Sequence, residues 1–227
     1  GKGFAVPKIF EIVSAGEKDY VLMQCIEGND ARNCSSEDAG KVGLELGKIQ
    51  SYYLSDGGHT ETAEYYWNRY LEKYYEKLKI FFSDIDDVWE MSKKRFFEVP
   101  QTLIHDDLLP INVLIGENQP WIIDWEIAGI YPYFLDLARF AYVYCSVDND
   151  FFISGEAANT FVDSYYKELK KNPNFGIDKK QFLYDVAISA LYQYIMFQDY
   201  DKSLEEIEDT VDFRYLKEII QVLREKG

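Results

Sequence analysis

Three oxygen-bearing side chains could together support phosphoryl transfer. Asp107 is followed by Asn112 five residues later, and Asp124 lies twelve residues beyond Asn112. Transfer of a phosphoryl group needs a carboxylate that accepts or orients the hydroxyl proton of the acceptor, and oxygen ligands that hold Mg²⁺ against the phosphates. These three residues supply that set. The plain alternative is that they are turn-favouring residues at the ends of hairpins.

Short β-prone runs are expected to position these residues. Leu103–Ile104, Val113–Ile115 and Trp121–Ile123 are apolar and are separated by turn residues. The loop between Asp107 and Asn112 would leave both side chains on one side of a short turn. The sequence therefore predicts a small β insert that carries the polar residues.

Helical periodicity surrounds this insert on both sides. Two strands are expected first, at Val6–Val13 and Tyr20–Ile26, and the stretch Ser35–Phe97 then reads as helical, with a second helix near Thr60–Phe82. Ser35 and Asp38 predict the cap of the first helix. After Pro132 the helical period returns in at least four segments, which are Tyr133–Cys145, Gly155–Leu169, Lys179–Gln198 and Leu204–Arg224.

Composition narrows the class of protein. The 227 residues are 47% hydrophobic, which is enough for a sizeable core, and no apolar run is long enough to span a bilayer. Three cysteines without metal-like spacing and two histidines argue for reduced thiols in the cytoplasm and against a His-rich metal site.

Charge indicates which partners the protein attracts. The net charge of −16 repels nucleic acids and anionic membranes and favours a cationic substrate. An alternative of equal weight is that the negative charge serves only to keep the protein soluble.

Three motifs in series carry a resemblance to a known family. His105-x-Asp107-Leu108-x-x-x-Asn112, with Pro110 in its interior, resembles the catalytic loop of kinases; Ile123-Asp124-Trp125-Glu126 resembles the metal-binding segment that follows it; Asp136-Leu137-Ala138 resembles the start of the next helix. In this order and spacing, the motifs make the chain similar to the aminoglycoside phosphotransferase and choline kinase family.

The resemblance implies an α+β, protein-kinase-like fold. Residues 1–28 would be a two-strand remnant of the N-terminal nucleotide-binding lobe with its hinge, and residues 29–227 a mostly helical catalytic and substrate-binding lobe. Within that lobe Asp107 would be the catalytic base, and His105 would brace the loop backbone. Asn112 and Asp124 would bind Mg²⁺, and Asp136 would hold the catalytic loop by hydrogen bonds.

The same resemblance implies a nucleotide site. Backbone groups near Gln24 and Ile26 would read the base of ATP, or of GTP, and Leu114 and Ile123 would form the apolar floor beneath it. The family's phosphate-covering loop and its phosphate-binding Lys are not found ahead of Val6. The chain is therefore expected to be truncated or to have lost its nucleotide lobe, and to be inactive alone.

The implied reaction is transfer of a γ-phosphoryl group to a hydroxyl of a small, cationic, aminoglycoside-like molecule, as in antibiotic resistance. A choline, sugar or amino-acid kinase, or a non-catalytic kinase-like binding domain, remains the alternative. Glu126 could be a supporting acid, a contact for a cationic substrate or a surface charge. The candidates for gripping the acceptor are Asp199, Asp201, Glu205 and Glu206.

Overall fold

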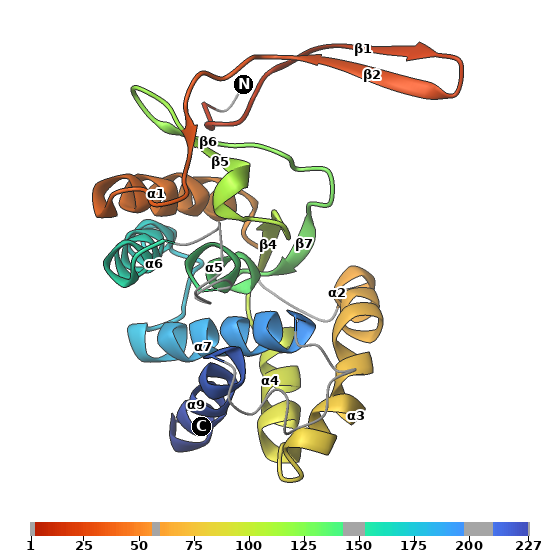
Figure 1. Ribbon diagram of the computed structural model, residues 1–227, viewed down its shortest axis with the longest axis vertical. Helices are drawn as coiled ribbons and strands as arrows, with labels where there is room; N and C mark the ends of the chain where they lie inside the picture. The colour runs from red at the N-terminus through yellow and green to blue at the C-terminus, as the bar shows by residue number, and fades with distance from the viewer. Residues whose placement is uncertain (1–2, 56–59, 143–152, 198–210, 227) are drawn as a thin grey trace.

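The protein is seen in a computed structural model that describes residues 3–55, 60–142, 153–197 and 211–226 (Figure 1). The α-helices in these ranges are α1 (Ser36–Tyr53), α2 (Glu61–Tyr66), α3 (Glu72–Phe81), α4 (Asp86–Glu98), α5 (Leu135–Ala141), α6 (Gly155–Leu169), α7 (Lys179–Phe197) and α9 (Val211–Lys226). The strands are β1 (Ile9–Ala15), β2 (Lys18–Met23), β3 (Asn29–Asp30), β4 (Gln101–Ile104), β5 (Val113–Ile115), β6 (Pro120–Ile122) and β7 (Gly129–Pro132).

The first two strands form an antiparallel hairpin that stands away from the helical body (Figure 1). Gly16, at a φ of +66°, opens its two-residue turn, a conformation that glycine adopts at little steric cost. Pairing therefore runs to Ala15, beyond the predicted end at Val13, and it begins only after Pro7, which has no N–H to donate to a ladder.

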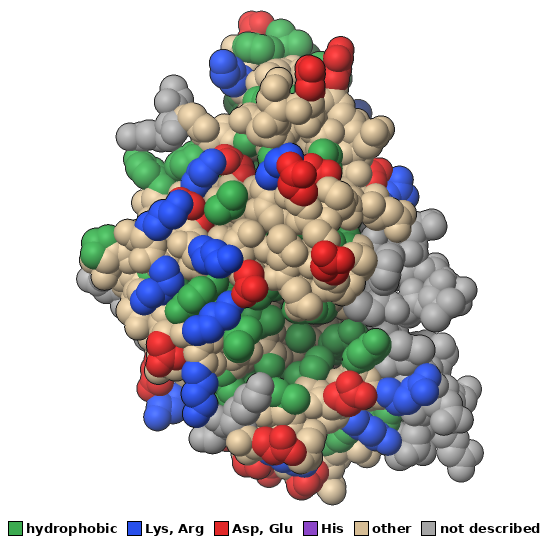
Figure 2. Space-filling model, turned by 90° about the vertical axis from the view of Figure 1, so that its left-hand side faces the viewer, with side chains coloured by type: hydrophobic (Ala, Val, Ile, Leu, Met, Phe, Trp, Pro, Cys, Tyr) green, Lys and Arg blue, Asp and Glu red, His purple; other side chains and the backbone are tan. Residues whose placement is uncertain are grey.

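Apolar side chains on both faces of this hairpin are exposed, and hydrophobic side chains are visible at the top of the space-filling view, where the hairpin lies (Figure 2). The larger ones are Ile9, Phe10, Ile12, Val13, Tyr20, Val21, Leu22 and Met23. Its apolar residues therefore contribute little to the core of the described chain.

Helix α1 packs closely against α6. Its cap is confirmed, because the Ser35 hydroxyl accepts a hydrogen bond from the Asp38 amide at 3.1 Å. One face of α1 carries Gly40, Gly43 and Gly47, which lie against the backbone and side chains of α6. The absence of side chains at these positions lets the two helices approach closely.

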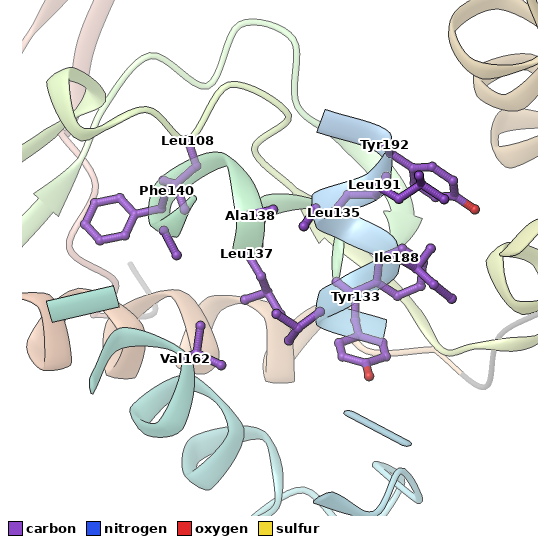
Figure 3. Packing of buried hydrophobic residues seen from close by; sticks show 14 of the residues in the cluster. Leu108, Tyr133, Leu135, Leu137, Ala138, Phe140, Val162, Ile188, Leu191 and Tyr192 are labelled. Atoms are coloured by element: carbon purple, nitrogen blue, oxygen red, sulfur yellow. The ribbon is translucent and has the colours of Figure 1, made fainter. Parts of the chain in front are cut away.

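Helix α5 occupies the centre of the core. Leu135, Leu137, Ala138 and Phe140 point from it toward side chains of α6 and α7, among them Val162 and Leu191 (Figure 3). All six are buried. A central helix packed on several sides fixes the residues at its N-terminal end, including Asp136, whose carboxylate accepts hydrogen bonds from the backbone of residues 105 and 106.

The β insert is built from two small sheets. One has the order β3-β5-β6, and the other pairs β4 with β7. The short runs predicted near β4, β5 and β6 are confirmed within one or two residues, whereas β7 was not predicted. Its four residues include Gly129 and Pro132, which do not favour a strand by themselves, and pairing with β4 imposes the extended conformation.

The predicted single helix at Thr60–Phe82 is wrong in one respect. A π-helical turn, Trp67–Leu71, separates α2 from α3, and the Glu72 amide bonds to the Trp67 carbonyl five residues back. The wider turn keeps both Trp67 and Leu71 buried in an aromatic part of the core. No helix within the described ranges is long and apolar enough to cross a membrane.

Candidate active site

The loop of residues 105–112, predicted to be the catalytic loop, is closed by a contact between Asn112 and Asp107. The Asn112 Nδ2 group donates to the Asp107 carbonyl at 2.8 Å and to its carboxylate Oδ2 at 3.1 Å. A 3₁₀ turn, Pro110–Asn112, brings the amide into reach, and Pro110 suits the first position of such a turn. Because Asp107 takes both N–H groups of the amide, the Asn112 Oδ1 atom stays available as a ligand.

His105 ties this loop to the segment that precedes Asp124. Its ring is buried, and Nδ1 accepts from the Asp107 amide at 3.3 Å, so the ring proton is carried by Nε2. Nε2 lies 2.7 Å from the Ile123 carbonyl and donates to it. Burial lowers the pKa of His105, which favours this neutral form. His105 therefore links the Asp107 amide to the Ile123 carbonyl, and its role in bracing the loop stays a prediction.

Asp136 holds the loop from below. It is fully buried, and its carboxylate accepts from the His105 and Asp106 amides, each at 2.9 Å, and from Gln50 Nε2 of α1 at 2.8 Å. Burial raises the pKa of Asp136 to about 6, although these donors and the nearby Arg139 act to lower it. The hydrogen bonds expected of Asp136 are thus present, and Gln50 adds one that was not expected.

Two aspartates of the site have a left-handed backbone. Asp106 has a φ of +64° and Asp124 a φ of +67°. Few residues other than glycine adopt this region, and Asp is among those that do so most readily. Asp106 is held by the Tyr66 hydroxyl, which donates to its Oδ1 at 2.8 Å, and burial raises the pKa of Asp106 to about 6.

A cavity of about 940 Å³ gathers the residues predicted for the nucleotide and the metal. Those predicted residues are Gln24, Ile26, Leu114, Ile123, Asn112 and Asp124. Glu126 lines the same cavity, as do residues of the hairpin such as Ile9, Val21 and Met23. Asp107 and His105 are not among its lining residues, but both are hydrogen-bonded to residues that are.

The hinge-like strand end leaves backbone groups unused. The Gln24 amide donates to the Lys8 carbonyl at 2.8 Å, whereas the Lys8 amide donates to the side-chain Oε1 of Gln24 at 3.4 Å. The Gln24 carbonyl and the Ile26 amide make no hydrogen bond to any other described residue. Such free groups beside an apolar cavity suit the edge of a planar base.

The donor set fits Mg²⁺ in particular. Within the ranges that the structure describes, no three or more His, Cys, Asp or Glu residues gather as a metal cage. Mg²⁺ is commonly held by one or two protein oxygens, with phosphates and water completing its shell. A free Asn112 Oδ1 and the exposed Asp124 carboxylate on one cavity provide that arrangement.

One contact of Asp107 was not predicted. Arg139 Nη2 donates to Asp107 Oδ1 at 2.7 Å, and Arg139 Nη1 donates to Gln193 Oε1 of α7 at 3.0 Å. The available signal was the position of Arg139 directly after Asp136-Leu137-Ala138. The predicted acceptor residues, Asp199, Asp201, Glu205 and Glu206, lie outside the described residues.

The family model described as "Phosphotransferase enzyme family" matches residues 1–170. A search of curated proteins found no match. Among solved structures, a Plasmodium vivax ethanolamine kinase is similar over 100% of this chain and 70% of its own, with a TM-score of 0.56 and 17% identity.

Two further solved structures give the same result. A choline/ethanolamine kinase family protein from Mesorhizobium loti is similar over 98% of this chain and 73% of its own, with a TM-score of 0.57 and 13% identity. An aminoglycoside phosphotransferase from Alicyclobacillus acidocaldarius is similar over 97% of this chain and 75% of its own, with a TM-score of 0.55 and 14% identity. These likenesses confirm the predicted α+β, kinase-like fold.

Proposed function

Because this chain belongs to the phosphotransferase enzyme family, we propose that it is the catalytic part of a kinase that transfers the γ-phosphoryl group of ATP, or of GTP, to a hydroxyl of a small cationic molecule. One observation supports this most strongly. The hinge-like residues and the two metal-ligand candidates line a single cavity, and Asp107 is hydrogen-bonded to one of those candidates. A nucleotide bound there would have its phosphates beside Asp107, the proposed catalytic base.

The proposed roles follow from the contacts. Asp107 accepts the proton of the acceptor hydroxyl, since a carboxylate oxygen has lone pairs beyond those that Arg139 and Asn112 use. Asn112 Oδ1 and Asp124 would hold Mg²⁺, which, when bound, neutralises charge on the phosphates. His105 keeps the base and the segment before Asp124 at a fixed separation through its two ring nitrogens.

Residues 1–28 are proposed to form part of the nucleotide side of the cavity. The Gln24 carbonyl and the Ile26 amide would bind the edge of the purine ring of the nucleotide, while Leu114 and Ile123 would contact the face of that ring. This arrangement combines an apolar surface with a few fixed polar groups, as small-molecule sites generally do. Residues 29–227 would carry the catalytic loop and the acceptor site.

The cationic acceptor is supported by charge and by the kinds of similar proteins. A net charge of −16 attracts cations and raises their local concentration. The similar structures include proteins named for choline, ethanolamine and aminoglycosides. An aminoglycoside is our first candidate because a sugar with several amino groups suits several carboxylates, and a small amino alcohol is the second.

The test is a panel of acceptors offered to the full-length protein with Mg²⁺ and ATP or GTP. It should include aminoglycosides, choline, ethanolamine and neutral sugars, each at low and high salt. We expect a cationic acceptor to be preferred and its KM to rise with salt, because screening is strong beyond about 10 Å at 0.1 M ionic strength. A neutral sugar as the best acceptor, with a salt-independent KM, would reject the cationic acceptor. Absence of both turnover and Mg²⁺-nucleotide binding would reject the kinase itself.

A further inference from the structure

Arg139 of α5 binds the carboxylate oxygen of the proposed base that Asn112 does not bind. Its Nη2 group donates to Asp107 Oδ1 at 2.7 Å, and the Asn112 amide donates to Asp107 Oδ2 at 3.1 Å. Both carboxylate oxygens are thus held by donors from different elements. We propose that Arg139 is a positioning residue that fixes the carboxylate plane of Asp107 for proton acceptance, an inference that rests on the proposed function.

The guanidinium is itself anchored. Arg139 Nη1 donates to Oε1 of the buried Gln193, which belongs to α7, so the group bridges the catalytic loop and the helical core. The Arg139 side chain is only 15% exposed. A planar guanidinium can make both contacts at once because its N–H groups point in fixed directions, whereas a lysine ammonium cannot reproduce this fork.

The charges around Asp107 explain why a cation is needed there. Asp106 is its neighbour in the chain, and the charges of Asp107 and Asp136 act to raise the pKa of Asp106. Arg139 acts in the opposite direction on both Asp106 and Asp136. His105 is neutral in the observed tautomer and does not offset this repulsion. Removing the guanidinium would take away both a hydrogen bond to Asp107 and the positive charge that offsets the neighbouring carboxylates.

Position matters more for a base than for a binding group. A misplacement of about 1 Å at a reacting group can lower turnover by about 100-fold. Nucleotide binding should be spared, because Arg139 is not among the residues that line the 940 Å³ cavity. The expected signature is therefore a fall in kcat with a nearly constant KM for the nucleotide.

The chain offers a matched control in Arg95 of α4. Arg95 donates to both oxygens of the buried Asp185 of α7, at 2.6 and 2.9 Å, and so forms a second Arg–Asp pair of similar chemistry. Among the described residues, the Arg95 side chain makes its hydrogen bonds and ion pair with Asp185 and none with residues 105–112. Arg139→Ala, Arg139→Lys and Arg139→Gln should be compared with Arg95→Ala in the full-length protein, together with urea unfolding and nucleotide affinity for each.

We expect kcat to fall by about 100-fold in Arg139→Ala and Arg139→Gln, and by less in Arg139→Lys. Guanidinium at concentrations far below those that unfold the protein should restore part of the kcat of Arg139→Ala. It should not raise the kcat of Arg95→Ala, whose defect should appear as lower resistance to urea.

Turnover of Arg139→Ala within a few-fold of the wild type would overturn the proposal. So would a folded Arg139→Ala that loses activity and is not rescued by guanidinium, since that indicates a general packing role. Failure of the proposed function is seen separately, because the wild-type protein would then show no turnover with any acceptor.

Discussion

Gly43 of α1 lies so close to Phe161 of α6 that a Cβ atom at Gly43 would be 2.3 Å from the Phe161 carbonyl oxygen. Backbone cannot yield as a side chain can, so Gly43→Ala must separate the two helices. We expect a loss of about 1–3 kcal/mol in the free energy of unfolding, measured by urea denaturation. Because α1 also carries Gln50, which donates to Asp136, turnover should fall as well.

Gly40→Ala is the control for that substitution. A Cβ atom there would meet the side chains of Thr160 and Ser164 at 3.1 and 3.3 Å, and these can rotate away. Alanine also gains about 0.5–1 kcal/mol over glycine inside a helix. Stability should therefore stay near that of the wild type, and equal losses at both positions would contradict the backbone explanation.

Asp107→Asn and Asp124→Asn should separate chemistry from binding. Loss of a base at Asp107 affects the transition state, so kcat should fall by about 10²–10⁴-fold with little change in affinity for Mg²⁺-ATP. Loss of a metal ligand at Asp124 should weaken that affinity as well. Isothermal titration calorimetry and steady-state kinetics provide both readouts. Equal weakening of nucleotide binding by the two variants would show that the roles are wrongly assigned.

His105 should remain neutral at physiological pH. Burial lowers its pKa, and its contacts require a proton on Nε2 and none on Nδ1. Ring ¹⁵N chemical shifts should show the Nε2–H tautomer, and titration should occur only below the usual value of about 6.5. The chain has two histidines, so a His59→Gln variant assigns the signals. A His105 ring that becomes charged at or above that pH would contradict the described contacts.

Asp136 should make stability depend on pH in a direction unusual for an acid. Its pKa is about 6 in the folded chain and about 3.9 when unfolded, so the folded state binds the proton more tightly. Its contribution is complete below about pH 4 and is lost as the pH rises through about 6, a change of roughly 3 kcal/mol. In Asp136→Asn the fall in unfolding free energy over this range should be shallower. Parallel pH profiles for the two proteins would refute this.

Sequence reasoning was most successful where a feature depends on neighbouring residues. The helix predicted at Gly155–Leu169 agrees with α6, and the short strands near β4, β5 and β6 were placed within one or two residues. The residues predicted for nucleotide and metal do line one cavity, although their roles are still proposals. Local spacing and periodicity determine these features, so a single sequence contains enough information.

Features that depend on distant partners were missed. Strand β7 is extended because β4 lies beside it, and the π turn in the second helical stretch follows from aromatic packing. The contacts of Arg139 with Asp107 and of Gln50 with Asp136 join residues 32 and 86 positions apart. No periodicity within one segment encodes such pairs, because they form only after the helices pack.

Asp106 and Asp124 give the site a property that its hydrogen bonds do not express. The residue beside the proposed base and the proposed metal ligand both have a backbone conformation that L-amino acids disfavour by roughly 1–2 kcal/mol. The folding energy landscape is locally frustrated at these positions, because the fold requires a backbone conformation that the residue itself disfavours. Glycine would relieve the conflict but would remove two carboxylates. In Asp106→Gly the released backbone strain and the lost Tyr66 hydrogen bond act on stability in opposite directions, so backbone preference and side-chain chemistry compete at this residue.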